Sequence, residues 1–546
     1  MKTKKIEFIA AASLLFSGIG ISQTVQAETP YYGKNYSQPE QVLKLYPDPK
    51  EIFQTPAFVK EGDEFTTQEE MIEYLHTIAD KSSYVSIKNI GTSLENRDIP
   101  ALYFTKDKRI HSISNKPLVW LQAQIHGNEP ASGESALAIA EKLAGDYGEN
   151  ILDKINVIIV PRINPDGSYA FNRRLASGLD GNRDHVKLDS AEVQAVHREF
   201  NRYSPEVVID AHEYSIGENS FAEIGSEGAL KYHDLLILSG KNLNIPEKIR
   251  STSDDLYIHS VMEKLKDEGF SSDPYYTTSG SDENGAINIY EGGTEARIGR
   301  NAIGLQPALS FLVESRGIGI GRENFARRVG AQVTTHEEIL NLTAEHADQI
   351  KKLVTYERFN LIAKGLNPND QDDVVIKSEF ADPKEDTLKL VDIAEGHVID
   401  APVQYYSATD AKATLTRKRP TAYLVLPGHE EVEEKLAVQG VKGYTLHKKM
   451  KLPVEAFQVT SKEQDGITEG RPVINVATEL VNEQREFPKG TKIYFTSQQQ
   501  NGLLSISLEP ESIDSYVSTG FIPSEAGQTL PVYRFVLDRK ALNINE

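Results

Sequence analysis

Apolar residues are grouped along the chain in two kinds of stretch, one of which fits a strand and the other a helix. Residues 117–125, 155–161 and 206–211 are short and strongly apolar, which predicts buried strands. Residues 131–144 and 190–202 carry apolar positions at helical spacing. Because the predicted strands are separated by predicted helices, we expect an α/β fold with a mostly parallel or mixed sheet flanked by helices.

One further predicted helix has a defined start. Met71, Leu75 and Ile78 have the spacing of one helical face. Thr67 is a suitable N-cap, and Glu70 stands three residues later, which is the sequence signature of a capping box. We therefore expect this helix to begin directly after Thr67.

The pattern changes in the last third of the chain. Residues 308–313 predict another buried strand and residues 337–364 a long helix, after which 365–373 (GLNPNDQDD) have the composition of a linker. Short β-type runs follow, at 421–426, 473–477 and 492–496. We predict a large α/β domain at 63–365 and a smaller, β-rich accessory domain at 374–546.

The first residues have the pattern of a secretory signal peptide. Lys2, Lys4 and Lys5 precede an apolar run over residues 8–21, and Ala27 ends a small-x-small cleavage pattern. The alternative, a membrane anchor, fits less well because the apolar run is short for a bilayer. We predict a signal peptide at 1–27, an irregular segment at 28–62, and an extracellular protein, with loose association with the cell wall left open.

Composition narrows the chemistry. The chain has 546 residues and no cysteine, so it has no disulfides and any zinc site must use His and carboxylate ligands, as catalytic rather than structural zinc sites do. The formal net charge is −21, and removal of residues 1–27, with three Lys and one Glu, would make it −23. Such a charge disfavours nucleic acid and anionic membranes as partners.

Candidate metal ligands stand at the ends of predicted strands. His126 and Glu129 follow the strand at 118–125, and His212 follows the strand at 207–211. In open α/β sheets, sites lie beyond the carboxyl ends of the strands. Two His and one carboxylate are the three protein ligands of a catalytic zinc, and a nearby free carboxylate, Glu314, is placed to take a proton from water.

The order of several motifs resembles the secreted bacterial members of the zinc metallocarboxypeptidases of the funnelin (M14) type. The resemblance runs over about residues 65–360. The motifs are Gly91-Thr-Ser-Leu-Glu-Asn-Arg-Asp-Ile99, His126-Gly-Asn-Glu129, Asn164-Pro-Asp-Gly167, Gly178-Leu-Asp-Gly-Asn-Arg183, Asp210-Ala-His212 and Phe311-Leu-Val-Glu314. Segments 419–425 and 530–534 also look like the appended domain of such proteins, but they imply no chemistry.

The resemblance implies roles for the residues around the metal. It implies one zinc ion per chain, and Glu314 as the general base and later the acid that protonates the leaving amine. Arg173 would polarise the scissile carbonyl and stabilise the oxyanion, with its neighbour Arg174 as the alternative. Asp180 would orient His126 through a hydrogen bond.

It also implies how the substrate is bound. Asn182 and Arg183 would hold the terminal carboxylate, a task that suits the paired donors of arginine. Tyr290 matches a mobile tyrosine that covers the substrate, although a strand-end aromatic that packs on its neighbours is the alternative. Side-chain preference stays open, because either Glu295 or Arg297 could face the substrate and the two predict opposite preferences.

Three other polar residues receive no role at this stage. His185 and Glu213 adjoin motif residues but have no required function, and we expect His197, on the helix at 190–202, to face solvent. The asparagine Asn128 stands where digestive members of the family carry an arginine, which leaves the substrate preference undefined.

The sequence thus predicts a secreted zinc metallocarboxypeptidase that hydrolyses C-terminal peptide bonds of substrates with a free terminal carboxylate. One alternative is a peptidase for peptidoglycan stem peptides. An alternative of another class is a wall- or glycan-binding protein with a vestigial metal site.

Overall fold

The structure is a computed structural model, and it describes residues 33–60, 62, 64–111, 114–281, 285–367, 370 and 372–537. The predicted signal peptide at 1–27 lies outside the described residues. In the described part of the irregular segment 28–62 there are two four-residue helices, α1 (Glu40–Leu43) and α2 (Pro56–Val59). Within the described residues, no helix is both long and apolar enough to cross a membrane.

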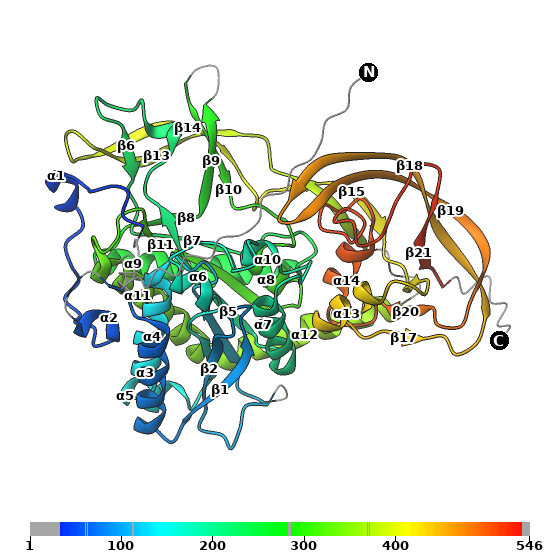
Figure 1. Ribbon diagram of the computed structural model, residues 1–546, viewed down its shortest axis with the longest axis horizontal. Coiled ribbons are helices and arrows are strands. Elements are labelled where there is room, and N and C mark those ends of the chain that lie inside the picture. Colours follow the sequence, from blue (N-terminus) through cyan, green and yellow to red (C-terminus); the bar gives the residue numbers. More distant parts are fainter. Residues whose placement is uncertain are drawn as a thin grey trace, which may run out of the picture. The chain divides into compact units, whose positions relative to one another are not determined.

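The centre of the fold is an eight-stranded mixed sheet with the order β1-β2-β4-β3-β5-β11-β7-β8. Its strands are β1 (Val85–Thr92), β2 (Asp98–Phe104), β3 (Leu118–Ala123), β4 (Asn156–Val160), β5 (Val207–Ser215), β7 (Leu235–Ser239), β8 (Ser272–Pro274) and β11 (Leu309–Ile318). The four inner strands β4, β3, β5 and β11 are parallel to one another, so their carboxyl ends lie at one edge. The predicted mixed sheet is confirmed (Figure 1).

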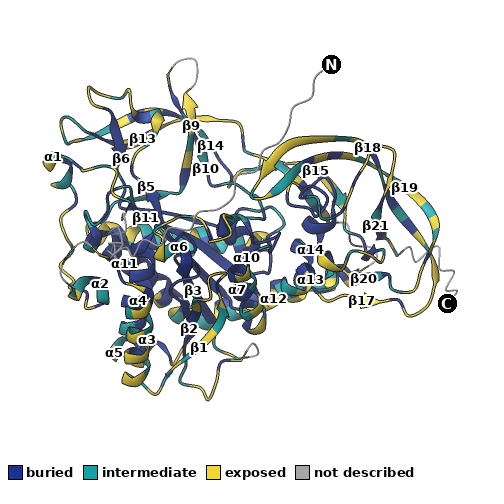
Figure 2. Ribbon diagram, in the orientation of Figure 1, coloured by how far each residue is buried: buried dark blue, intermediate teal, exposed yellow. Residues whose placement is uncertain are grey.

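Helices cover both faces of this sheet, and Figure 2 shows the strands between them as buried. Alternation along a strand divides its side chains between the two faces. In β3, Val119 and Leu121 join the core beneath α4 and α11, while Leu118 and Trp120 join the core beneath α7. These helices are α3 (Gln68–Lys81), α4 (Pro130–Leu143), α5 (Asp146–Ile151), α6 (Pro165–Tyr169), α7 (Ala191–Tyr203), α8 (Glu247–Thr252), α9 (His259–Asp267), α10 (Gly299–Gly304), α11 (Phe325–Glu345) and α12 (Ala347–Leu366).

The helix α3 confirms the local prediction for its start. The Thr67 side chain accepts a hydrogen bond from the Glu70 N–H, and the Glu70 carboxylate accepts one from the Thr67 N–H. Met71, Leu75 and Ile78 are buried on one side of the helix. The long helix predicted at 337–364 is instead divided between α11 and α12, which meet at His346.

A second, five-stranded sheet joins segments that are far apart in the sequence. Its order is β6-β13-β14-β10-β9. The strands are β6 (Ala229–Lys231), β9 (Tyr276–Ser281), β10 (Ile287–Glu291), β13 (Lys384–Asp392) and β14 (Val398–Tyr406). Strand β14 pairs with β10 in parallel, and β13 pairs with β6. Residues 384–406 therefore share a sheet with the region before 365, and the predicted boundary at 374 stays a prediction.

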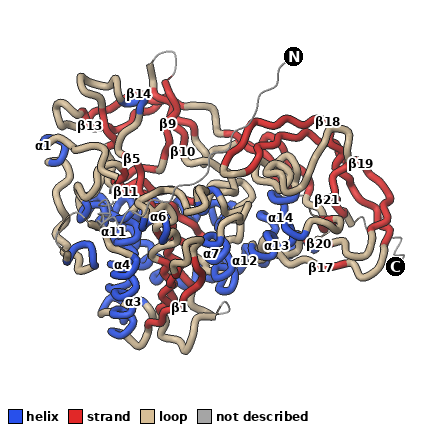
Figure 3. Tube along the Cα trace, viewed as in Figure 1, coloured by secondary structure: helices blue, strands red, loops and turns tan. Residues whose placement is uncertain are grey.

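The rest of the C-terminal region is β-rich, as predicted (Figure 3). It contains the pair β12 (Asp373–Glu379) and β15 (Lys412–Lys418), and a six-stranded sheet with the order β17-β20-β16-β21-β18-β19. The sheet strands are β16 (Ala422–Val425), β17 (Tyr444–Thr445), β18 (Met450–Thr468), β19 (Arg471–Phe487), β20 (Lys492–Phe495) and β21 (Thr529–Phe535), with helices α13 (Glu430–Val438) and α14 (Asn501–Leu508). Strands β18 and β19 form a long hairpin, and Thr468 and Arg471 are the last pair before its turn.

Candidate metal centre and active-site cavity

The candidate residues lie together on three neighbouring parallel strands, but β5 and β11 continue past the predicted ends at 211 and 313, to Ser215 and Ile318. His126 and Glu129 occupy the turn between β3 and α4, and Glu129 is the residue directly before the helix. His212 and Glu314 lie on β5 and β11, where the parallel register pairs them directly. Sequence reasoning predicted this convergence, because parallel strands end at the same edge of a sheet.

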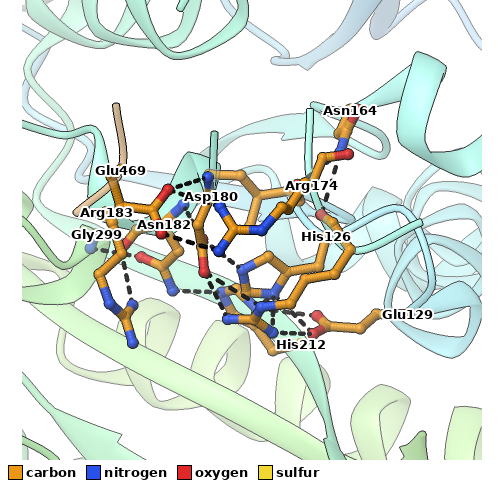
Figure 4. Close-up of polar contacts among 12 residues, drawn as sticks. His126, Glu129, Asn164, Arg174, Asp180, Asn182, Arg183, His212, Gly299 and Glu469 are labelled. Atoms are coloured by element: carbon orange, nitrogen blue, oxygen red, sulfur yellow. Dashed lines mark hydrogen bonds and ion pairs between the residues drawn. The ribbon is translucent and has the colours of Figure 1, made fainter. Parts of the chain in front are cut away.

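The three predicted ligands form a compact, buried cluster (Figure 4). One ligand atom from each of His126, Glu129 and His212 lies within 4.8 Å of the others. The two Nδ1 atoms are 3.2 Å apart, and the Glu129 oxygens lie 2.7 Å from His126 Nδ1 and 3.0 Å from His212 Nδ1. Two Zn–N bonds of about 2.0–2.1 Å at a tetrahedral angle would separate their nitrogens by about 3.3 Å. This ligand set therefore fits zinc.

The second nitrogen of each histidine faces a carboxylate. His126 Nε2 is 3.0 Å from Asp180 Oδ1, as the resemblance implied, and His212 Nε2 is 3.2 Å from Asp210 Oδ2. Burial opposes the charge of Asp180, but the hydrogen bond and positive charge of His126 outweigh it and hold the pKa of Asp180 well below its usual range. Such carboxylates fix the ring orientation of metal-binding histidines.

Glu314 lies beside this cluster and has no direct hydrogen bond to it among the described contacts. Glu314 is only 7% exposed, and this burial raises the pKa of its carboxyl group to about 7. His212 opposes this shift, whereas the charge of Glu129 adds to it. A carboxyl group with a pKa near neutrality exchanges protons readily at the pH at which most enzymes work.

Arg173 and Arg174 point in different directions. Arg173 donates to Asp180 Oδ2 at 2.9 Å and 3.2 Å, and its Nη1 lies 3.4 Å from Glu129 Oε1. Arg174 instead donates to the carbonyl oxygen of Gly178 and to Glu469. Of the two arginines that the sequence left open, Arg173 is therefore the one beside the metal ligands.

Asn182 and Arg183 lie on a short 3-10 turn, Gly181–Arg183. Both residues border a cavity that also contains His126 in its wall. The Asn182 side-chain oxygen accepts the Gly299 N–H at 2.7 Å, and its Nδ2 lies 3.3 Å from His212 Nε2. The Arg183 guanidinium is half-buried and donates to the carbonyl oxygen of Asn182 at 2.9 Å. Asn182 thus stands next to the proposed metal ligands, and Arg183 borders the cavity beside it.

The cavity has a volume of about 600 Å³ and contains the predicted residues Arg173, Asn182, Arg183, Tyr290 and Glu314 in its walls. The C-terminal region also contributes to these walls, through Phe380, Thr468, Glu469 and Ile513. Sequence reasoning assigned the chemistry to residues before 365 and missed this contribution.

Tyr290 borders the cavity from β10. Its ring stacks on Tyr406 of β14 with centroids 4.4 Å apart, and meets Phe380 edge-on at 5.3 Å. Both the packing and the position beside the cavity that the sequence suggested are therefore present, and its role toward substrate stays a prediction.

Two buried residues were not recognised from the sequence. Arg300 is 2% exposed, borders the cavity and donates to the Gly293 carbonyl oxygen at 2.7 Å. Asp210 lies two residues before His212 on β5, where strand alternation places both side chains on the same side of the sheet. The motif Asp210-Ala-His212 therefore contained a signal for this contact, whereas the sequence around Arg300 gave none.

The expectation that His197 faces solvent is wrong. His197 is 2% exposed and hydrogen-bonds His185 at 3.0 Å. The helical period puts His197 on the same face of α7 as Val193, Val196 and Phe200, which packs on the sheet. Burial lowers the pKa of His185 to about 4 and that of His197 well below its usual value.

Glu213 is also buried, and its contacts explain it without a catalytic role. Its carboxylate accepts the Ala131 N–H at 2.7 Å and pairs with Arg328 at 2.6 Å. It therefore holds the start of α4 against β5.

The two candidates for side-chain preference differ in their partners. The Arg297 guanidinium pairs with Asp514 and donates to the Ile513 carbonyl oxygen at 3.0 Å. Glu295 is half-buried and borders the cavity. Arg297 also borders the cavity, but its guanidinium is engaged with the C-terminal region, and the side-chain preference stays a prediction.

The chain is similar to known zinc carboxypeptidases. A family model for zinc carboxypeptidases matches residues 71–219. The carboxypeptidase 2 of Trichophyton equinum is 33% identical over 500 residues, which cover 88% of this chain and 90% of that protein. The carboxypeptidase 2 of Trichophyton rubrum is 33% identical over 484 residues, 87% of each protein. The carboxypeptidase A structure from Helicoverpa armigera aligns with a TM-score of 0.39 at 16% identity, over 52% of this chain and 75% of that one.

The fold and site thus define a zinc-dependent peptidase, and the chain belongs to the M14 family of zinc carboxypeptidases. It is a zinc metallocarboxypeptidase of this family, as the sequence predicted. The two carboxypeptidase 2 relatives given above are fungal. The resemblance to bacterial members of the family therefore stays a prediction.

Proposed function

We propose that His126, Glu129 and His212 hold one zinc ion per chain, and that the enzyme hydrolyses the last peptide bond of substrates with a free terminal carboxylate. The observation that carries the proposal is the convergence of the three buried ligand atoms within 4.8 Å. When bound, zinc supplies Lewis acidity toward water and toward a carbonyl oxygen. The other steps fall to side chains of the cavity.

Glu314 is proposed to move the protons. Its carboxylate would take a proton from the attacking water and later give a proton to the leaving amine. The support is its position opposite His212 on β11 and a pKa that burial raises to about 7, which suits both uptake and release.

Arg173 is proposed to stabilise the negative charge that develops on the carbonyl oxygen. Its guanidinium is fixed by two hydrogen bonds to Asp180 and stands beside Glu129. A fixed positive group favours the transition state more than the ground state, because the charge it meets grows during the reaction.

Asn182 and Arg183 are proposed to bind the terminal carboxylate, with Tyr290 covering the substrate. Asn182 is held between Gly299 and His212, so its amide has a defined orientation. Arg183 borders the cavity and offers donors that suit a carboxylate. This pair would distinguish the last residue of a peptide from all internal ones.

The test compares free-acid peptides with their C-terminal amides. We expect the free acids to be cleaved far faster, and Arg183→Ala to reduce the difference mainly by slowing the free acids. Arg198→Ala, at an exposed position of α7, is the control and should keep the difference. Similar rates for acid and amide in the unchanged protein, or internal cleavage, would show that the carboxylate is not the feature recognised.

A modest preference for basic terminal side chains is proposed from Glu295. Both Glu295 and Arg297 border the cavity, but the charge of Arg297 is paired with Asp514. Arg300 is close enough to Glu295 to offset part of its charge, so the expected preference is several-fold rather than absolute. Glu295→Gln should lower kcat/KM for substrates ending in Lys relative to those ending in Leu.

The physiological substrate and location belong to the same proposal. The predicted signal peptide supports action outside the cell, and the free carboxylate requirement fits both protein peptides and muropeptides. Incubation with a peptide library and with digested cell wall, followed by mass spectrometry of the released residue, separates these substrates. Wall binding with no release from either would favour the alternative of a binding protein with a vestigial site.

A further inference from the structure

The turn of the β18–β19 hairpin reaches the active-site cavity from the C-terminal sheet. Thr468 and Arg471 are the last paired residues, so Glu469 and Gly470 form the turn. Thr468 and Glu469 both border the cavity that contains Arg173 and Glu314. Figure 4 shows Glu469 next to Asp180 and Arg174.

The Glu469 carboxylate binds two points of the chain segment that carries the proposed catalytic groups. Its Oε2 and Oε1 accept hydrogen bonds from Arg174 at 2.9 Å and 3.1 Å. Oε2 also accepts the Asp180 N–H at 2.7 Å. The Glu469 side chain is 13% exposed and the Arg174 side chain 48%, so the bond to the Asp180 N–H is better shielded from water than the bonds to Arg174.

Between these two points the segment folds back on itself. The Leu175 N–H donates to the Leu179 carbonyl oxygen at 2.9 Å, and the Gly178 N–H donates to the Leu175 carbonyl oxygen at 2.8 Å. Arg174 donates to the Gly178 carbonyl oxygen at 2.8 Å. Glu469 therefore clamps the base of a closed loop, which we call the 174–180 loop.

The ends of the 174–180 loop carry the groups that contact the metal ligands. Asp180 binds His126 Nε2 through one carboxylate oxygen and Arg173 through the other. Arg173 directly precedes the loop. A shift of the Asp180 backbone would move both of these contacts, so the Glu469 contact with the Asp180 N–H acts on the site through Asp180.

The backbone of Glu469 supports a role for its side chain. Glu469 has φ of +47° and Gly470 has φ of +71°, both in the left-handed region. Residues other than Gly, Asn and Asp rarely adopt this conformation, and it persists where surrounding contacts hold it. A turn that served only to connect two strands would favour Gly or Asn at position 469.

A neighbouring ion pair attaches the same hairpin without contacting the 174–180 loop. Arg471 binds Asp189 through two hydrogen bonds of 2.9 Å and 3.0 Å, and its guanidinium lies 3.8 Å from the Phe521 ring centroid. Docking of the hairpin and support of the loop are thus carried by different residues.

We propose that Glu469 is a positioning residue for the carboxypeptidase reaction, through which the C-terminal sheet holds Asp180 and Arg173 in place beside the metal ligands. The inference rests on the proposed roles of Arg173 and Asp180. It gives the C-terminal region a part in catalysis, in addition to its contribution to the cavity wall.

The test compares Glu469→Ala with the matched control Arg471→Ala. Glu469→Ala should lower kcat by about 10- to 100-fold, the range found when groups that orient metal ligands are removed, with a smaller change in KM. It should also speed zinc loss to a chelator and increase hydrogen exchange of the segment 173–183. Arg471→Ala should keep kcat, zinc retention and exchange of this segment near normal.

Two further variants separate positioning from stability. Glu469→Gln keeps an acceptor for the Asp180 N–H and should recover part of kcat. Glu469→Gly relieves the left-handed backbone, so Tm should be held or raised while kcat still falls. A merely structural role would change Tm and kcat together.

Two outcomes would overturn the proposal. The first is normal kcat, zinc retention and exchange in Glu469→Ala, and the second is an equal loss in Arg471→Ala. Failure of the proposed function would look different, because it would appear as normal turnover in Glu314→Gln. Chelator competition and hydrogen exchange test the role of Glu469 without a turnover measurement.

Discussion

Two groups of ionisable side chains are buried in this protein, and they differ in how their charges are arranged. His126, Glu129 and His212 lie beside the eight-stranded sheet, on the turn after β3 and on β5, with ligand atoms 2.7–3.2 Å apart. In the C-terminal region, Arg417 and Glu509 belong to a group in which carboxylates face guanidinium groups. The first group brings imidazole and carboxylate ligand atoms together, and the second pairs carboxylates with arginines.

The second group, which we call the C-terminal ion network, consists of Arg417, Glu509, Glu511 and Arg534. Arg417 Nη1 lies 3.0 Å from Glu509 and 2.7 Å from Glu511, and Arg534 Nε lies 3.2 Å from Glu509. The Tyr423 hydroxyl donates to Glu509 at 2.8 Å. Glu509 is fully buried and Arg534 is 2% exposed.

The two groups differ in how their buried charges are compensated, and this difference suggests a chemical role for the first group and a structural role for the second. A buried carboxylate stays charged only when paired, and the C-terminal ion network pairs each one within the protein. At the proposed metal ligands, two imidazole nitrogens and a carboxylate converge within 4.8 Å, an arrangement that is compatible with metal binding.

The largest expected effect is loss of metal. The His126→Ala, His212→Ala double variant should bind no zinc at the site and lose activity, because one carboxylate cannot hold the ion alone. Metal analysis after dialysis and a peptide hydrolysis assay measure both quantities. His259→Ala, whose side chain is 71% exposed, is the control and should keep zinc and activity. Full zinc content in the double variant would remove the assignment of these ligands.

The next effect falls on the C-terminal ion network. Glu509→Gln removes the buried carboxylate that Arg417 and Arg534 share, and leaves Arg534 with Glu455 and Arg417 with Glu511. It should lower the free energy of unfolding by about 3 kcal/mol, the lower end of the range for a broken buried ion pair. Zinc content and kcat should stay normal at temperatures where the variant is folded. Urea unfolding followed by circular dichroism tests this. Glu525 is an exposed partner of Lys462, so Glu525→Gln should change neither the free energy of unfolding nor kcat. An unchanged stability in Glu509→Gln would mean that the network does not hold the sheet.

A third effect concerns proton transfer. Glu314→Gln should keep zinc and the fold but lower kcat by at least ~10²-fold. In the unchanged enzyme, kcat/KM should fall as pH decreases through the Glu314 pKa, because the base must be ionised to accept a proton. That pKa is raised to about 7 by burial, and the positive charge of a bound metal would move the midpoint lower. Near-normal turnover in Glu314→Gln would assign water activation to another residue.

The smallest effect concerns a single hydrogen bond of the C-terminal ion network. Tyr423→Phe removes a bond to a charged acceptor and should lower the free energy of unfolding by about 1.5–3 kcal/mol, less than Glu509→Gln. Activity should not change. Tyr444→Phe, at an exposed position, is the comparison variant. A larger loss for Tyr423→Phe than for Glu509→Gln would contradict the view that charge pairing is the main contribution.

The sequence predicted the parts of the site that follow from local pattern. Predicted strand ends at 125, 211 and 313 brought His126, His212 and Glu314 together, because neighbouring parallel strands run in register, although the strands end at 123, 215 and 318. It also predicted the cap of α3. Each of these depends on residues that are near in sequence or on the general geometry of a parallel sheet.

Contacts between distant segments were beyond this reasoning. Glu469 is a single charged residue in a polar turn, and nothing in its own segment indicates a partner near 174–180. The same holds for β14, whose pairing with β10 joins the two predicted domains. For His197 the local sequence was sufficient. The helical period of α7 predicts its burial, but the solvent-facing prediction followed the polarity of histidine instead.

The long separation between the ligands and the hairpin turn has a consequence for biosynthesis. A ribosome completes all three proposed ligands and Glu314 before it makes Phe380, Tyr406 or Glu469, which complete the cavity wall and clamp the 174–180 loop. A nascent or truncated chain that ends near residue 366 should be able to take up metal yet cleave poorly. Full proteolytic activity would therefore require synthesis to have passed Glu469.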